Sequence, residues 1–248
     1  MKPGILVTRA TLQANKTIAA ITEQNWKPIL FPTVEIHASN QQENNTLFSQ
    51  LDSYDWLIFI SQNAVNHFIK QISHLPSNMP SIATIGLATS EAAHQAGLEV
   101  LQQPEHRFDS EGLLATEAFS NLSNKKILII RGNGGRELLA ETLRERGAQV
   151  TYAQVYERRL PKVNTKPLIQ QWNAEVDIIL STSNQLLDNL VTLVGKEIGQ
   201  KLFSTPIVVV SKRMQQHALN LGFDKIWLAE GASDDQMIIT IKKHLAIN

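Results

Sequence analysis

Eight short runs of apolar residues recur along the chain, each separated from the next by polar turns and helical patterns. The runs lack the polar alternation of a strand that has one face in water, so both faces of each are expected to be covered. Covered strands of this kind form parallel sheets with helices on both sides, which predicts an α/β fold. The runs are residues 5–7, 57–60, 82–85, 98–101, 127–130, 178–180, 207–210 and 226–228.

The two halves of the chain also echo each other. Residues 5–36 match residues 127–158 without a gap, so that Arg9 falls on Arg131. Three further segments match in the same order at nearly the same spacing, and one of them places Asn63 on Asn184. This pattern indicates two three-layer lobes related by internal duplication. The alternative is that all strand–turn–helix units look alike, which explains one or two matches more easily than four in register.

Two polar stretches, 39–46 and 161–167, have the composition of linkers. Each follows a run with strand character, at 29–36 and at 150–160. The linkers bracket a central block, and its edges do not fall at the midpoint of the repeat. We therefore expect an inserted lobe at 39–160 and a discontinuous terminal lobe made of 1–38 and 161–248.

Charge and composition exclude several classes of function. The 23 basic and 23 acidic side chains cancel, so no global field attracts nucleic acid or an anionic membrane. The absence of cysteine excludes disulfides and thiolate chemistry, and the seven histidines have no ligand spacing, so we expect no metal. No apolar stretch approaches the ~20 residues of a membrane span and the N-terminal run is too short for a signal peptide, which favours the cytoplasm.

The segment RGNGGR at 131–136 looks at first like a phosphate-binding loop, because a strand precedes it and Gly132, Gly134 and Gly135 make the turn. It lacks the glycine spacing of a dinucleotide site and the lysine–hydroxyl pair of a P-loop. A nucleotide cofactor is therefore not expected.

The turns after the strands carry the candidate binding residues, because ligands of open parallel sheets bind outside the carboxyl ends of the strands. Each turn opens a helix, whose free N–H groups favour an anion. The alternative is that these polar side chains only cap their helices. The candidates are Arg9, Ser61, Gln62, Asn63, Gly86, Arg131, Asn133, Thr182, Ser183, Ser211 and Lys212.

Tyr156 lies in the segment QVYERRL, on a strand-like run beside the second linker. A tyrosine there usually serves packing, with its hydroxyl at the rim. It could also present that hydroxyl as a proton donor, and the residues alone leave both interpretations open.

Taken together, the segments of this chain resemble those of the uroporphyrinogen-III synthase family over almost the full length of the chain. The resemblance rests on the order and spacing of LVTR (6–9), FISQNAV (59–65), ATIGLATSEAAHQAGL (83–98), FDSEGLL (108–114), ILIIRGNGGRELLAETLRERGAQV (127–150), VYER (155–158) and STSN (181–184). It adds Thr89, which with Gly86 matches a glycine-and-threonine turn of the family.

The resemblance implies two lobes joined by a two-stranded ladder of residues 29–38 and 150–160, with the active cleft between the lobes. It implies a monomeric lyase that dehydrates hydroxymethylbilane, closes the macrocycle and inverts the last ring without a cofactor or metal. Tyr156 matches the family tyrosine suggested as the proton donor. The alternative is a two-lobed, non-catalytic small-molecule binding protein, which would have the same architecture.

Overall fold

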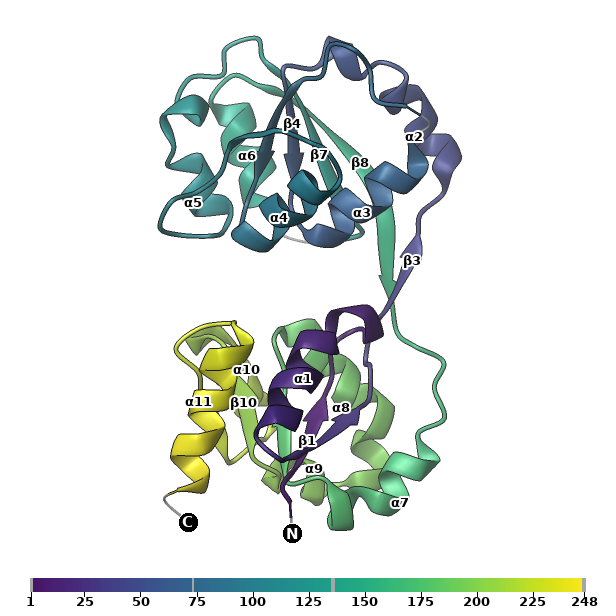
Figure 1. The fold of residues 1–248 in the computed structure, drawn as a ribbon, viewed down its shortest axis with the longest axis vertical. Helices are drawn as coiled ribbons and strands as arrows, with labels where there is room; N and C mark the ends of the chain where they lie inside the picture. The colour runs from purple at the N-terminus through teal and green to yellow at the C-terminus, as the bar shows by residue number, and fades with distance from the viewer. Residues whose placement is uncertain (1, 73, 135–136, 247–248) are drawn as a thin grey trace. The chain divides into compact units, whose positions relative to one another are not determined.

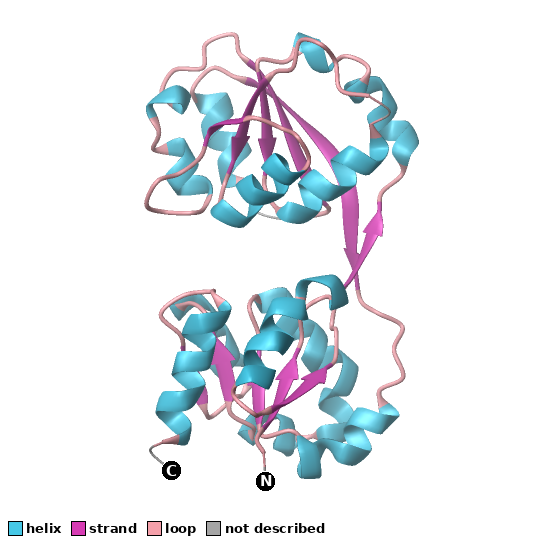
Figure 2. Cartoon of the chain, in the orientation of Figure 1, coloured by secondary structure: helices cyan, strands magenta, loops and turns pink. Residues whose placement is uncertain are grey.

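The computed structural model describes residues 2–72, 74–134 and 137–246 and divides into two compact units (Figure 1). Unit 1 comprises Met1–Glu35 and Arg159–Asn248, and unit 2 comprises Ile36–Arg158. Each unit is built on its own sheet with helices on both faces (Figure 2). The expected α/β class with parallel sheets is confirmed. That residues 39–160 fold by themselves stays a prediction.

Unit 1 contains a five-stranded sheet in the order β11-β10-β9-β1-β2, in which every neighbouring pair is parallel. Its three central strands are buried on both faces, as their unbroken apolar sequences require. The strands are β1 (Gly4–Val7), β2 (Lys27–Leu30), β9 (Ile178–Leu180), β10 (Ile207–Val209) and β11 (Ile226–Leu228). The helices are η1 (Thr11–Gln13), α1 (Asn15–Glu23), α7 (Lys166–Glu175), α8 (Asn184–Ile198), α9 (Gln200–Ser204), α10 (Lys212–Leu221) and α11 (Asp234–Leu245).

Unit 2 contains a six-stranded sheet in the order β3-β8-β7-β4-β5-β6. The strands are β3 (Glu35–Ala38), β4 (Trp56–Phe59), β5 (Ser81–Thr84), β6 (Val100–Gln102), β7 (Lys126–Gly132) and β8 (Gln149–Arg159). The helices are α2 (Gln41–Phe48), η2 (Leu51–Ser53), α3 (Gln62–Gln71), α4 (Leu87–Gln95), α5 (Ser110–Leu114), η3 (Glu117–Phe119) and α6 (Leu138–Glu145).

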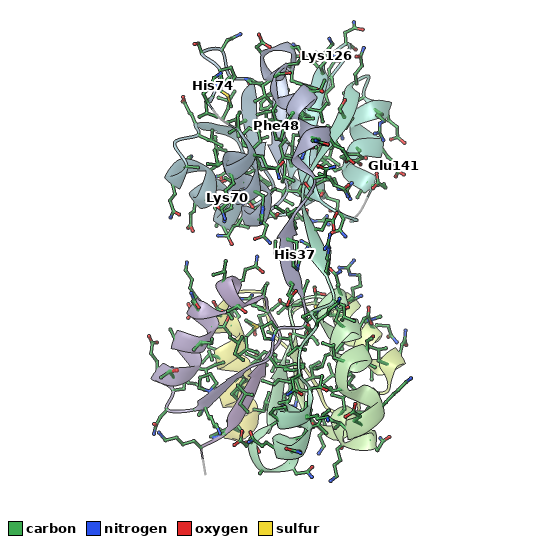
Figure 3. All side chains as sticks on the ribbon, turned by 90° about the vertical axis from the view of Figure 1, so that its right-hand side faces the viewer. His37, Phe48, Lys70, His74, Lys126 and Glu141 are labelled. Carbon is green, nitrogen blue, oxygen red and sulfur yellow. The ribbon has the colours of Figure 1, made fainter. Side chains whose placement is uncertain are left out.

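In the described part of the chain, four apolar cores fill the spaces between sheets and helices. In unit 2, α2, α3 and α4 pack on one face around Phe48 and Phe68, while α5 and α6 pack on the other around Leu113 and Leu143. Figure 3 shows Phe48 in the interior of this unit. In unit 1, α7 to α10 cover one face and α1 and α11 the other. Among the described residues, no core cluster contains buried residues of both units.

The echo in the sequence corresponds to an equivalence of strands. It pairs β1 with β7, β2 with β8, and β4, β5 and β6 with β9, β10 and β11, and these sets occupy the same places in the two sheets. Two matched helix ends also agree: Asn25 and Gly147 both have positive φ, as do Gly97 and Gly222. Unit 1 therefore combines two strands from the first half of the chain with three from the second, and unit 2 combines β7 and β8 from the second half with four strands from the first.

Three expectations about local structure were wrong. Residues 39–46 are not a linker, because α2 begins at Gln41, with the Asn40 side chain capping it and Glu43 in its first turn. The ladder is shorter than 29–38, because residues 29–30 belong to β2 and pair with β1, while only β3 pairs with β8. The run 98–101 forms a strand only from Val100, since Leu98 packs into the core behind the turn at Gly97.

Candidate functional site

A bulge in β8 decides where Tyr156 points. On β8, Val150 and Tyr152 pack toward α5 and α6, whereas Ala153 and Val155 pack toward α3 and α4. Simple alternation would place Tyr156 with Tyr152. The register to β7 instead shifts between Arg131 and Gly132, so that Val155 is an extra residue. Tyr156 is thereby turned into the core beneath α3 and is fully buried.

The hydroxyl of Tyr156 joins two polar side chains. It lies 3.1 Å from Ser61 Oγ and accepts a hydrogen bond from Arg158 Nη2 at 3.0 Å. The guanidinium carbon of Arg158 lies 5.5 Å from the centre of the tyrosine ring, close enough for a cation–π contact. A phenol between a hydroxyl and a guanidinium can act as an acid, because the cation stabilises the anion that remains after proton loss.

His67 covers the tyrosine ring from α3. The two ring centres are 5.7 Å apart and the planes are tilted by 31°. Partial burial lowers the pKa of His67, and Lys70 in the last turn of α3 (labelled in Figure 3) adds to the shift. The imidazole is therefore neutral at neutral pH, and its contact with Tyr156 is one of packing.

Gly132 is the neighbour that makes room for this ring. A Cβ atom at position 132 would lie 2.4 Å from Cε2 and 2.5 Å from Cζ of Tyr156, far inside van der Waals contact. The last residue of β7 must therefore be glycine for the tyrosine to occupy its place.

Replacement of Gly132 with alanine is expected to displace the Tyr156 ring and to separate its hydroxyl from Ser61 and Arg158. Overpacking of this kind costs about 1–3 kcal/mol of folding free energy, and misplacement of a reacting group by about 1 Å costs about 10²-fold in rate. The matched control is Gly231→Ala, where the nearest atom of the described residues lies 3.8 Å from the new Cβ. Melting temperature and turnover of both variants check this, and normal turnover by Gly132→Ala would contradict it.

Asn133 ties the turn after β7 to β8. Its side-chain oxygen accepts the backbone N–H of Arg158 at 2.6 Å, and its backbone N–H donates to the carbonyl of Tyr156 at 3.1 Å. Asn133 thus holds the segment that carries both Tyr156 and Arg158. Gly135, expected in the same turn, lies outside the described residues.

Arg131 points away from Tyr156, to the other side of the sheet. It is buried, pairs with Glu137 at 3.0 Å and lies over the ring of Tyr152. The pKa of Glu137 is lowered, mainly by the hydrogen bond from Tyr152 and next by the one from Arg131. The pKa of Tyr152 is raised, mainly by burial and next by its hydrogen bond to Glu137. The charge of Arg131 is therefore compensated, and its role here is to close the turn.

Three of the candidate serines cap helices. Each side-chain oxygen accepts the backbone N–H of the residue three positions later in the chain, at 3.1 to 3.2 Å. The three are Ser61 at the start of α3, Ser183 at the start of α8 and Ser211 at the start of α10. Capping accounts for the described contacts of Ser211, and for the hydrogen bond that the Ser183 side chain makes. Of these three, only Ser61 combines its cap with a side-chain partner in the described part of the chain, and that partner is Tyr156.

In unit 1, Arg9 and Thr182 come together after β1 and β9. Arg9 Nε donates to Thr182 Oγ1 at 3.4 Å, and its Nη1 contacts Thr17 at 3.0 Å and Asp234 at 3.1 Å. Asp234, in the first turn of α11, is the carboxylate partner of Arg9. The guanidinium of Arg9 therefore fastens α1 and α11 to the end of the sheet.

The remaining candidates lie in the first turns of helices. Gln62 is exposed and Asn63 partly exposed at the start of α3, and Lys212 is exposed at the start of α10. The carbonyl of Gly86 accepts the N–H of the buried Thr89 in the first turn of α4. Asp109 is the cap of the next helix, α5, where it accepts the N–H of Gly112.

Sequence reasoning missed Arg158 and His67. Tyr156 and Arg158 are two positions apart on a strand, so both side chains lie on one face. This spacing would have indicated Arg158. His67 gave no signal, because its contact with Tyr156 depends on the bulge. In the described part of the chain, no three acidic or histidine side chains gather into a metal site, and no helix is long and apolar enough to cross a membrane.

Comparison with known proteins adds an independent finding. Residues 15–239 match the family model described as uroporphyrinogen-III synthase HemD. The chain is 30% identical to the uroporphyrinogen-III synthase of Escherichia coli (strain K12) over 241 residues, which cover 95% of this chain and 98% of that protein. It is 31% identical to the enzyme of that name from Proteus mirabilis over 195 residues, 76% of this chain and 98% of that one.

Two solved structures share the fold. A mutant uroporphyrinogen III synthase from the extremely thermophilic bacterium Thermus thermophilus aligns with a TM-score of 0.66 at 17% identity, covering 98% of this chain and 99% of that one. The uroporphyrinogen-III synthetase of Helicobacter pylori 26695 aligns with a TM-score of 0.64 at 16% identity, over the whole of both chains.

Proposed function

Because this chain belongs to the uroporphyrinogen-III synthase family, we propose that its reaction centre is the Tyr156 hydroxyl with Ser61 and Arg158 beside it. The protein is a uroporphyrinogen-III synthase, a cyclising lyase of haem biosynthesis. It removes the hydroxyl of hydroxymethylbilane as water, closes the macrocycle and inverts the terminal ring. The observation that carries the assignment of the centre is the tyrosine hydroxyl held between a serine and an arginine.

Departure of the substrate hydroxyl as water requires a proton. Tyr156 is the candidate source, because a phenol hydroxyl can donate a proton and Arg158 donates to its oxygen. General acid catalysis contributes about 10²–10⁴-fold, whereas holding the two chain ends together contributes up to about 7–11 kcal/mol. Positioning of the bilane is therefore the larger part of catalysis.

Binding must recognise a substrate with many carboxylates on a protein without net charge. The helix starts at Ser61, Gly86, Ser183 and Ser211 offer backbone N–H groups with partial positive charge. Lys212 is an exposed cation at one of them. Gln62, Asn63, Thr89, Asn133 and Thr182 complete the proposed contacts. Arg9 and Arg131 are already paired with carboxylates, so we assign them to holding the turns.

The substrate is a small molecule, and neither nucleic acid nor a membrane is needed for this reaction. We further propose that the protein acts in the cytoplasm as a monomer. The reaction as written requires no redox step and no cofactor.

Incubation of the purified protein with freshly prepared hydroxymethylbilane is expected to give the inverted, type III macrocycle, faster than the blank. The isomers are separated chromatographically after oxidation to the porphyrins. Tight binding of the bilane with only the uninverted isomer, formed at the rate of the blank, would instead identify a non-catalytic binding protein.

A further inference from the structure

The buried position of Tyr156 raises the question of which group touches the substrate. The tyrosine side chain is 0% exposed, so its hydroxyl meets only protein atoms in this structure. Ser61, at the start of α3, is partly exposed and lies 3.1 Å from that hydroxyl. A proton that begins on the tyrosine can therefore leave the core through the serine.

The hydrogen bonds around the two hydroxyls set the direction of this transfer. Arg158 Nη2 only donates, so the tyrosine oxygen accepts from it, and Ser61 Oγ at 3.1 Å is the acceptor within reach of the tyrosine's own proton. Ser61 Oγ also accepts the backbone N–H of Ala64 at 3.1 Å. A hydroxyl has two acceptor positions and one donor proton. With both acceptor positions used, the proton of Ser61 is the one left to donate outward.

Arg158 is suited to stabilise the tyrosine after the transfer. Among the described residues, no carboxylate lies within ion-pair distance of its guanidinium, which contacts the oxygen and the ring face of Tyr156. Its backbone is held by Asn133, so the side chain starts from a fixed point. The guanidinium is thus placed beside the oxygen on which negative charge develops as the proton leaves. Ser183 and Ser211, the equivalent helix caps in unit 1, make no such pair within the described ranges.

We propose that Ser61 delivers the proton to the leaving hydroxyl of the substrate, that Tyr156 replaces it, and that Arg158 is the positioning residue of this relay. The inference rests on the proposed function. In the step, the C–O bond of the substrate breaks, its electron pair leaves with the oxygen, and the Ser61 proton completes a water molecule. Ser61 takes the Tyr156 proton, and the phenolate is held by Arg158. The ring carbon that finally closes the macrocycle loses its own proton, which restores the phenol.

Ser61→Ala is the direct test, with Ser233→Ala as the matched control. Ser233 caps α11 in the same way, accepting the N–H of Gln236 at 3.3 Å, and lies in the other unit from Tyr156. Loss of a cap costs both variants about 0.5–2 kcal/mol of stability. Only Ser61→Ala is expected to lose about 10²–10⁴-fold in single-turnover rate. Ser61→Thr keeps the hydroxyl and is expected to recover most of the rate.

The double variant Ser61→Ala with Tyr156→Phe separates a relay from two independent roles. Two members of one relay lose their function together, so the double variant is expected to be about as slow as the slower single variant. If the two residues acted independently, the fold-losses in rate of the two single variants would multiply in the double variant. The wild-type rate in mixtures of light and heavy water is expected to curve with deuterium content, because two protons move. A linear dependence, or multiplied losses, would overturn the relay.

Arg158→Gln is expected to lower kcat with little change in KM, and Arg158→Lys to recover part of the loss. A rise in KM alone would overturn its role in the relay and make Arg158 a binding residue. If wild-type protein forms the type III isomer and Tyr156→Phe is slow while Ser61→Ala is as fast as Ser233→Ala, the relay fails and the tyrosine assignment stands. If wild-type protein makes no type III isomer, the proposed function itself fails.

Discussion

Tyr156→Phe is expected to slow turnover by about 10²–10⁴-fold, the usual contribution of a general acid, while the protein stays folded. The ring remains buried beside Gly132 and His67, because phenylalanine has the same shape without the hydroxyl. Ser61 keeps its bond to the N–H of Ala64, and Arg158 is partly exposed and can be hydrated. The substitution therefore removes the acid without emptying the core.

Tyr152→Phe is the matched control for this variant. Tyr152 lies on the same strand but faces the other side of the sheet, where its hydroxyl donates to Glu137 at 2.5 Å. We expect near-normal turnover from it. Single-turnover rates and melting temperatures of both variants decide the matter. Wild-type turnover by Tyr156→Phe would reduce Tyr156 to packing, and a residual rate equal to the blank would mean that positioning contributes less than we infer.

The fold was largely predictable because its signals are local. Unbroken runs such as 127–130 and 178–180 lie where the sheets are buried on both faces, and helix starts follow from capping residues such as Asp109. The error at 39–46 has a physical cause. Amide-rich segments resemble loops in composition, but here Asn40 caps the segment, and Leu47 and Phe48 anchor it to the core of unit 2.

The site was predictable in its residue types but not in its contacts. Tyr156 was a candidate from its place on the chain, yet a bulge that nothing in the local sequence indicates puts it beneath α3. Ser61 fitted the cap pattern and is a cap, and its second partner depends on that same bulge. Pairing of Arg9 with Asp234 joins positions at opposite ends of the chain, which no local pattern reveals.

A fragment of residues 36–158 is expected to fold cooperatively by itself, whereas a fragment of residues 1–121 is not. All six strands of the unit 2 sheet lie within residues 35–159, and both of its cores are built from residues of that range. A chain ended at 121 lacks β7 and β8. It therefore exposes the edge of β4 and the apolar faces that those strands and α6 cover. It also leaves β1 without β9.

The two fragments are of similar length, so chain size alone cannot favour the folding of either. A domain boundary at the midpoint of the repeat would make 1–121 the folding unit. The strand equivalence argues the opposite, because each sheet combines strands from both halves of the chain. Trp56 is the only tryptophan in 36–158, and it packs against Phe119 with ring centres 4.9 Å apart. Its fluorescence is expected to report a single unfolding transition on heating. Cooperative melting of 1–121, with 36–158 disordered or aggregated, would contradict the exchange of strands between the halves.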